Sequence, residues 1–126
     1  MKTLVVIAVL TAFAVGCASA VPISRSWTYP QFNAVGMGLC AATTDTLKDL
    51  ARIELYAQDQ GRSDSVLVFA KLCAGLQGRA DSTVVDQKEG TRFYWLYAFD
   101  ALGNRSCQSN VTMKTVVQPP EPATMR

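Results

Sequence analysis

Four cysteines and the absence of histidine limit the chemistry that this chain of 126 residues can perform. Without histidine, the usual Ser–His and Cys–His nucleophile pairs cannot form. No C-x-x-C pair occurs among Cys40, Cys73 and Cys107, so a zinc site is also disfavoured. The acidic residues that could pair for acid–base work stand in turns and at element edges, where Asp usually serves local hydrogen bonding; they are Asp45, Asp49, Asp59 and Asp64. We therefore expect a protein that is not an enzyme and that uses no metal or cofactor.

A run of aromatic residues is the second feature that could recognise a ligand. The segment from Gly90 to Asp100 reads GTRFYWLYAFD, which is too short for a membrane span and rich in strand formers. It predicts a central β-strand. Gly103 and Asn104 supply turn residues after it, and a second strand is expected from Ser109 to Thr115. Together these segments predict a β-hairpin.

Residues 1–20 have the pattern of a secretory signal. A single charge at Lys2 precedes an apolar core from Leu4 to Val15 and a small-residue exit that ends at Ala20. The same segment contains the residues AVGC ending at Cys17, which are close to the lipobox of bacterial lipoproteins. Two outcomes stay open: cleavage after Ala20, or cleavage before Cys17 with a lipid on that cysteine attaching the protein to a membrane. Either outcome predicts a secreted or cell-envelope protein.

The charge of the chain argues against nucleic acid as a partner. The formal net charge is +2, and removal of the signal with Lys2 leaves +1. The basic residues do not cluster along the sequence, whereas nucleic acids are bound through many clustered Lys and Arg side chains. An exported chain that retains three cysteines is expected to form one disulfide and to leave one cysteine over.

Patterns elsewhere in the chain predict three more strands and one long loop. Ser65–Leu72 is a continuous apolar run, and Ser82–Asp86 is a shorter one. Residues 47–57 alternate apolar and charged side chains, which favours a strand. A helix from Thr46 to Gln58 is the alternative, because Leu, Lys, Glu and Ala are good helix formers. Gln31–Thr46 is rich in Gly, Ala and Thr without periodicity, so it predicts a loop.

The spacing of residues in the hairpin is similar to that of a known family. Matching positions are Gly90, Thr91, Ala98, Asp100, Gly103, Asn104, Ser106, Ser109 and Asn110. This pattern resembles the last two strands of a secreted bacterial-type fibronectin type III domain, which has an immunoglobulin-like fold. Residues 26–30 (SWTYP) resemble the second strand of that family, and residues 49–56 (DLARIELY) resemble the third. The resemblance implies an all-β, antiparallel β-sandwich of about six to seven strands over residues 21–117, followed by a Pro-rich extended tail at 118–126.

The resemblance also implies which side chains face the core. It places Trp27 as the largest buried side chain and turns Tyr94, Leu96 and Ala98 inward. The opposite face then presents a row of aromatic rings to solvent, which is typical of a surface that binds carbohydrate or protein; the row consists of Phe93, Trp95, Tyr97 and Phe99, beside Tyr56 on the neighbouring strand. Coverage of this row by a loop, the tail or a partner chain is the alternative. Arg92 stands where the family has an inner aromatic, so either it reaches out at the sandwich end or the register is shifted by one residue.

Three loops gather at one pole in the fold that the resemblance implies, and Cys40, Cys73 and Cys107 lie in or beside them. On that basis we predict a Cys40–Cys107 disulfide, with Cys73–Cys107 as the alternative pairing. No separate first strand is recognisable before Trp27, which leaves one sheet edge short and open to self-association. The function expected is that of a binding module. A self-associating surface lipoprotein or virion-decorating subunit is the alternative.

Overall fold

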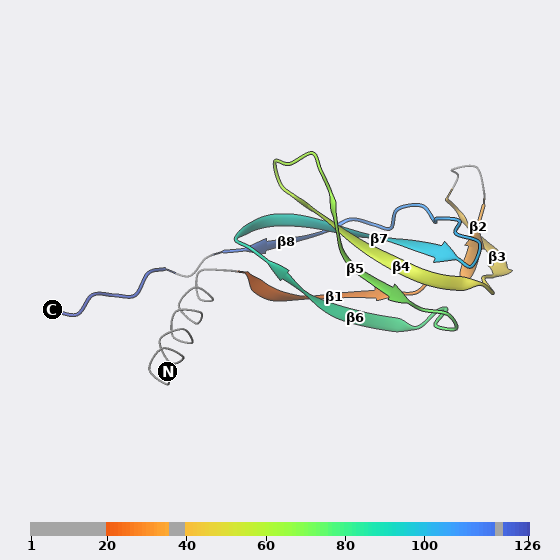
Figure 1. Cartoon of the computed structure of the whole chain (residues 1–126), viewed down its shortest axis with the longest axis horizontal. Helices are drawn as coiled ribbons and strands as arrows, with labels where there is room; N and C mark the ends of the chain where they lie inside the picture. Colours follow the sequence, from red (N-terminus) through yellow and green to blue (C-terminus); the bar gives the residue numbers. More distant parts are fainter. Residues whose placement is uncertain (1–19, 36–39, 118–119) are drawn as a thin grey trace, which may run out of the picture.

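The structure is a computed structural model, which describes residues 20–35, 40–117 and 120–126 (Figure 1). The predicted signal up to residue 19, including Cys17, lies outside the described residues. Within the described ranges the chain forms eight strands and no helix. The strands are β1 (Val21–Thr28), β2 (Phe32–Ala34), β3 (Ala42–Thr46), β4 (Leu50–Asp59), β5 (Val66–Leu72), β6 (Ala80–Gln87), β7 (Gly90–Asp100) and β8 (Thr112–Val116). Among these residues, no helix is long and apolar enough to cross a membrane.

The strands form an antiparallel β-sandwich, as the sequence predicted. One layer is a four-stranded sheet in the order β5-β4-β7-β8, and the other is the β1–β6 pair. The β2–β3 hairpin lies at the end of the molecule away from the C-terminal tail (Figure 1). β4 alternates buried and half-buried side chains along most of its length, which confirms the predicted strand over the alternative helix.

The core lies between the two sheets and has two clusters of buried side chains. In the first, Ile23 and Val85 from the β1–β6 pair pack on Leu55 and Tyr94 from the four-stranded sheet. The second cluster comprises Tyr29, Leu50, Ile53 and Cys73. Full burial of one such aliphatic side chain contributes roughly 1.5–3 kcal/mol, so these clusters hold the sheets face to face.

Trp27 is not the largest buried side chain, so that prediction is wrong. Its ring is half-buried and packs against the second cluster, while Tyr29 and Tyr94 are only 2% and 1% exposed. The difference arises because β1 pairs with β6 alone among the described residues, so Trp27 lies near an edge of this two-stranded sheet. The two tyrosines therefore anchor the core.

The segment 31–46 is also not a simple loop. Phe32 pairs with Thr46 and Ala34 with Ala42, so a short irregular hairpin occupies most of this segment. The number of strands is therefore eight, whereas six or seven were predicted. The physical reason is the Thr-rich run in β3, because β-branched residues favour extended backbone even without an apolar pattern.

A buried amide closes the core beneath β7. Gln87 is 1% exposed, and its side chain is fully paired: Tyr94 donates its hydroxyl to Gln87 Oε1 at 2.8 Å, and Gln87 Nε2 donates to the carbonyls of Gly90 (3.1 Å) and Lys114 (2.8 Å). Burial raises the pKa of Tyr94, which keeps its hydroxyl protonated as a donor. Each buried polar atom of the amide thus has a partner.

Arg92 keeps the predicted register and reaches out at the end of the sandwich. Its Nε donates to Asp59 Oδ1 at 2.7 Å on the paired strand β4. This contact with Arg92 lowers the pKa of Asp59. Because Tyr94, two residues along, is buried, the alternative of a shifted register is excluded.

A second polar cluster joins the two sheets along one side. Asp81 Oδ2 accepts hydrogen bonds from Lys71 Nζ on β5 and from the hydroxyl of Tyr29, both at 2.7 Å. These two contacts lower the pKa of Asp81 to about 2. Burial, together with the hydrogen bond to Asp81, raises the pKa of Tyr29 to about 12.

Candidate functional site

The outer face of the four-stranded sheet carries the aromatic residues that the sequence singled out. In the β4–β7 pairing, Tyr56 lies opposite Trp95, Glu54 opposite Tyr97, and Gln58 opposite Phe93. We call the half-buried residues Tyr56, Phe93, Trp95 and Tyr97 the aromatic face. The predicted alternation is confirmed for β7, since Tyr94, Leu96 and Ala98 turn to the core on the other side.

Phe99 does not join the aromatic face as an exposed ring. It pairs with Arg52, whose guanidinium lies 3.8 Å from the ring centroid, and only 9% of the residue is exposed. The extra residue in this pairing, between Leu50 and Arg52, belongs to β4, so Phe99 keeps its place in the alternation of β7. Its ring is buried because the Arg52 side chain covers it. The prediction of four solvated rings in a row is therefore wrong at its last position.

The rings of the aromatic face are held in a defined geometry. Tyr56 stacks on Trp95 with ring centroids 6.4 Å apart and an angle of 11° between the ring planes, and it meets Tyr97 edge-on at 5.6 Å. The Tyr56 hydroxyl donates to Glu54 Oε1 at 2.9 Å, which raises the pKa of Tyr56. The Arg105 guanidinium lies 4.4 Å from the centroid of Tyr97. These contacts fix the arrangement of the rings before any ligand arrives, with Tyr56 and Trp95 nearly parallel and Tyr97 almost perpendicular to Tyr56.

Exposed apolar side chains extend the aromatic face to both neighbouring strands. Leu67 on β5 pairs with Tyr56 and is 50% exposed, and Met113 on β8 pairs with Phe93 and is 62% exposed. Apolar surface therefore continues across all four strands of the sheet. Patches of this kind mark interaction sites more often than isolated exposed residues do.

The segment 101–111, which we call the strap, supports β7 beyond the point where β8 ends. Backbone N–H groups of Ala98 and Leu96 donate to the hydroxyls of Ser106 (2.9 Å) and Ser109 (2.8 Å), and the N–H groups of the same two serines donate to the carbonyls of Ala98 (2.8 Å) and Leu96 (3.0 Å). The serines thus replace the acceptors that a strand would supply. Sequence reasoning found these serines as a motif but did not predict this role.

The turn at the start of the strap depends on a single carboxylate. Asp100 Oδ1 accepts hydrogen bonds from the N–H groups of Leu102 (3.0 Å) and Asn104 (2.8 Å). Gly103 has a φ of 87°, which a residue with a side chain rarely adopts. Bonds from Asn104 lower the pKa of Asp100, so the turn is held by a charged acceptor.

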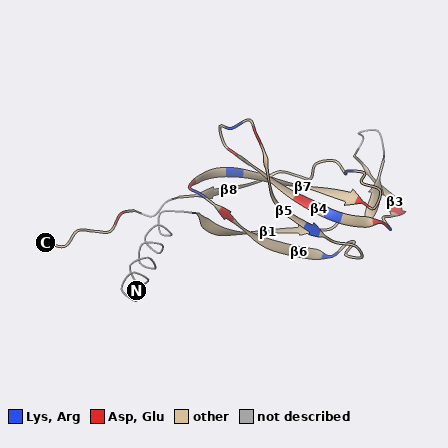
Figure 2. Ribbon diagram, viewed as in Figure 1, with Lys and Arg blue, Asp and Glu red and all other residues tan. Residues whose placement is uncertain are grey.

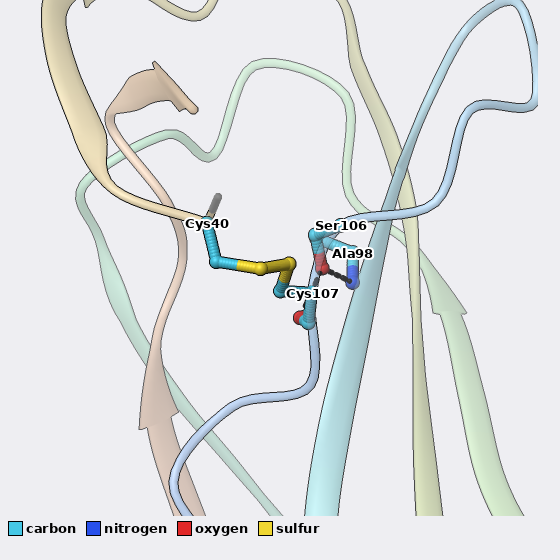
Figure 3. The surroundings of a disulfide bond; sticks show 4 residues. All are labelled: Cys40, Ala98, Ser106 and Cys107. Atoms are coloured by element: carbon cyan, nitrogen blue, oxygen red, sulfur yellow. Dashed lines mark hydrogen bonds between the residues drawn. A yellow bond between two sulfur atoms is a disulfide. The ribbon is translucent and has the colours of Figure 1, made fainter. Parts of the chain in front are cut away.

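A disulfide joins Cys40 to Cys107, as predicted (Figure 3). The Cα atoms are 5.7 Å apart, and the bond ties the middle of the strap, next to Ser106, to the start of β3 in the β2–β3 hairpin. The alternative pairing with Cys73 is excluded, because Cys73 is a free thiol with 1% of its surface exposed. Burial raises the pKa of the Cys73 thiol. A disulfide is typical of proteins that fold in an oxidising compartment.

Charged side chains do not gather into one patch on the described part of the chain. Figure 2 shows Lys and Arg interspersed with Asp and Glu along the strands. Of the four aspartates noted in the sequence, Asp59 pairs with Arg92 and the other three are exposed. No group of three or more potential metal ligands occurs among the described residues.

No protein-family model, no curated protein and no solved structure matches this chain. The fold therefore rests on the strands and their pairing, and the resemblance to fibronectin type III domains stays a prediction.

Proposed function

We propose that this protein is a non-enzymatic binding module of the extracellular space or cell envelope and that its aromatic face contacts a carbohydrate or a protein. The observation that carries the proposal is the stacked pair of Tyr56 and Trp95 at the centre of a continuous apolar surface. Preorganised rings contribute contact area at little cost in conformational entropy. Trp and Tyr are also the residues that most often dominate binding energy at interfaces.

The chemistry of the face favours ligands with a flat apolar side and polar edges. The ring faces offer apolar area for stacking, while Glu54 and Arg105 place charged groups beside Tyr56 and Tyr97. A sugar ring has such a shape, and so does the exposed surface of a partner sheet.

The proposal is tested by comparing Trp95→Ala with Val84→Ala. Val84 is an exposed apolar residue of the other sheet, so it is a matched control. On arrays of glycans and of extracellular proteins, we expect each ligand bound by the wild type to be lost by Trp95→Ala and kept by Val84→Ala. Val84→Ala should retain the wild-type melting temperature. Trp95→Ala loses the stacking on Tyr56, worth about 0.5–1.5 kcal/mol, so it should melt somewhat lower but stay folded with a native circular dichroism spectrum at the assay temperature. Ligands bound equally by Trp95→Ala and the wild type would refute the proposal.

The extracytoplasmic location is proposed from the Cys40–Cys107 disulfide together with the secretory pattern of residues 1–20. Mass spectrometry of the processed N-terminus tests this. Cleavage after Ala20 predicts a chain that begins at Val21, and the lipoprotein alternative predicts an acylated Cys17. An intact Met1 in material from the native host would contradict both.

Structural self-association is the second candidate function, because β1 has a strand neighbour on only one side among the described residues. Light scattering at micromolar concentration tests this function. A monomer under these conditions would exclude a purely self-assembling role.

A further inference from the structure

Within the described part of the chain, β1 has a strand neighbour on one side alone, and its other edge presents a regular set of backbone groups. Two residues show which backbone groups point to which side of β1. The N–H of Tyr29 donates to the Arg79 carbonyl on the β6 side at 2.9 Å, whereas Pro22 has no N–H to donate. Since successive residues of a strand direct their N–H and C=O groups to opposite sides, odd-numbered residues face β6 and even-numbered residues face the open edge. The open edge therefore offers the backbone groups of Ser24, Ser26 and Thr28.

Two cavities lie side by side along this open edge. One of about 300 Å³ is lined by Trp27, Thr28 and Leu96 together with the strap. A smaller one of about 170 Å³ is lined by Arg25, Trp27 and Leu96 and by the strap and the start of β8. Both cavities thus have β1 as one wall and β7 with the strap as the other. β6, which also has an open edge, lines neither of them.

The two cavities follow each other along β1: Arg25 lines the smaller one alone, Trp27 lines both, and Tyr29 lines the larger one alone. Side chains on one face of a strand recur every two residues, about 6.6–6.8 Å apart. An additional strand hydrogen-bonded to β1 would therefore direct alternate side chains into the space between β1 and the strap, one into each cavity. Main-chain bonding combined with alternate side-chain pockets is the general form of recognition by strand addition.

The side chains at the cavities define the chemistry of such a strand. The Arg25 guanidinium lies 5.1 Å from the centroid of the Tyr94 ring and makes no ion pair within the described ranges. It lines the smaller cavity, where a carboxylate would complement its charge. Trp27 is half-buried between both cavities, and its indole N–H is buried without a well-aligned acceptor. A large apolar side chain in the larger cavity would cover this ring.

We propose that β1 binds an extended segment of a separate polypeptide, which adds a third strand to the β1–β6 sheet. The segment carries Asp or Glu beside Arg25 and a large apolar residue two positions away beside Trp27. It has no proline at the positions whose N–H groups face β1. The aromatic face lies on the opposite side of the four-stranded sheet, and it shares with this site only the positions Trp95, which borders the smaller cavity, and Tyr97, which borders the larger one.

A second copy of this chain is a poorer occupant of the edge than an acidic segment. Two β1 strands paired antiparallel with full overlap of residues 22–28 would place Arg25 directly opposite Arg25 of the other copy. Like charges directly opposite each other destabilise a strand pair. An acidic side chain at that place has the opposite effect.

Selection from a phage-displayed library of random nonapeptides against the full-length chain tests the proposal. We expect enriched peptides with an acidic residue two positions from a large apolar one. Binding should become about tenfold weaker in Arg25→Met and should be lost in Ser26→Pro, which removes one edge N–H without removing a bond to β6. Val84→Ala should bind like the wild type. Enriched peptides without this pattern, or with unchanged affinity for both β1 variants, would overturn the proposal.

Amide hydrogen exchange gives a second readout that needs no variant. In the free chain the N–H groups of Ser24, Ser26 and Thr28 should exchange faster than those of Ile23 and Trp27. A selected peptide should slow these three amides. Two results would overturn the proposal. Slow exchange of all three amides before any peptide is added would mean that the edge is already covered. Protection that grows with protein concentration alone would mean that the edge pairs with a second copy.

Discussion

Replacing Cys40 and Cys107 together by alanine should remove much of the stability of this protein. The two residues are 67 positions apart, so the bond closes most of the folded chain into one loop. Loop-closure entropy for this length corresponds to about 4 kcal/mol at 25 °C, which is an upper value because the denatured state is not a random coil. Domains of this size have a total stability of about 5–15 kcal/mol. The melting temperature should accordingly fall by about 15–30 °C.

Differential scanning calorimetry of four samples separates this cause from local damage. Cys40→Ala, Cys107→Ala, the double variant and the reduced wild type all lack the same bond, so their melting temperatures should agree within a few degrees. The effects of the two single substitutions should not add. A reduced wild type that melts like the oxidised protein would refute the argument that the bond constrains the denatured chain.

Three further outcomes follow from the contacts in the core. Tyr94→Phe leaves Gln87 Oε1 buried without a donor and should cost about 1–3 kcal/mol in urea unfolding; an unchanged midpoint would contradict this pairing. Asp81→Asn should lower stability by a constant amount above pH 4. This difference from the wild type should shrink as the pH falls toward 2, because the Lys71 ammonium lowers the pKa of Asp81 and that contribution disappears once the folded carboxylate is protonated. Equal pH profiles for the two proteins would refute it. Trp27→Ala should cost about 2–3 kcal/mol, less than the ~3–5 typical of a fully buried large aromatic, and complete unfolding of this variant would show that the ring is a core anchor after all.

Strict alternation is what made the central part of the fold predictable from the sequence. β7 and β4 follow a period of two, so the order of residues along each strand separated its two faces. The resemblance then indicated which face of β7 is the inner one, because both faces carry aromatic residues. The predicted exposure failed at Phe99, because the Arg52 side chain that covers its ring comes from the neighbouring strand and leaves no trace in the sequence of β7. The short β2–β3 hairpin was missed for a related reason: polar three- to five-residue strands carry no hydrophobic pattern.

Other parts of the site depend on contacts that spacing alone does not encode. The Cys40–Cys107 pairing came from the resemblance, because one sequence with three cysteines beyond the signal cannot choose among partners. The hydroxyl bonds of Ser106 and Ser109 require knowing that the strap runs beside β7. The open edge of β1 was foreseen from the lack of an earlier strand, but the two cavities beside it depend on where the strap lies in space.

The position of the disulfide has a mechanical consequence. If the chain is pulled from its two ends, the covalent path runs from the N-terminal part to Cys40, across the bond, and on from Cys107 to the C-terminus. Strands β3 to β7 lie wholly between the two cysteines and therefore outside this covalent path. Only the segments before Cys40 and after Cys107 can therefore be extended while the disulfide is intact, and the chain between the two cysteines, which are 67 positions apart, cannot. Reduction would release about 220–240 Å of additional contour length, so an anchored molecule under load would lengthen abruptly only after its disulfide is cut.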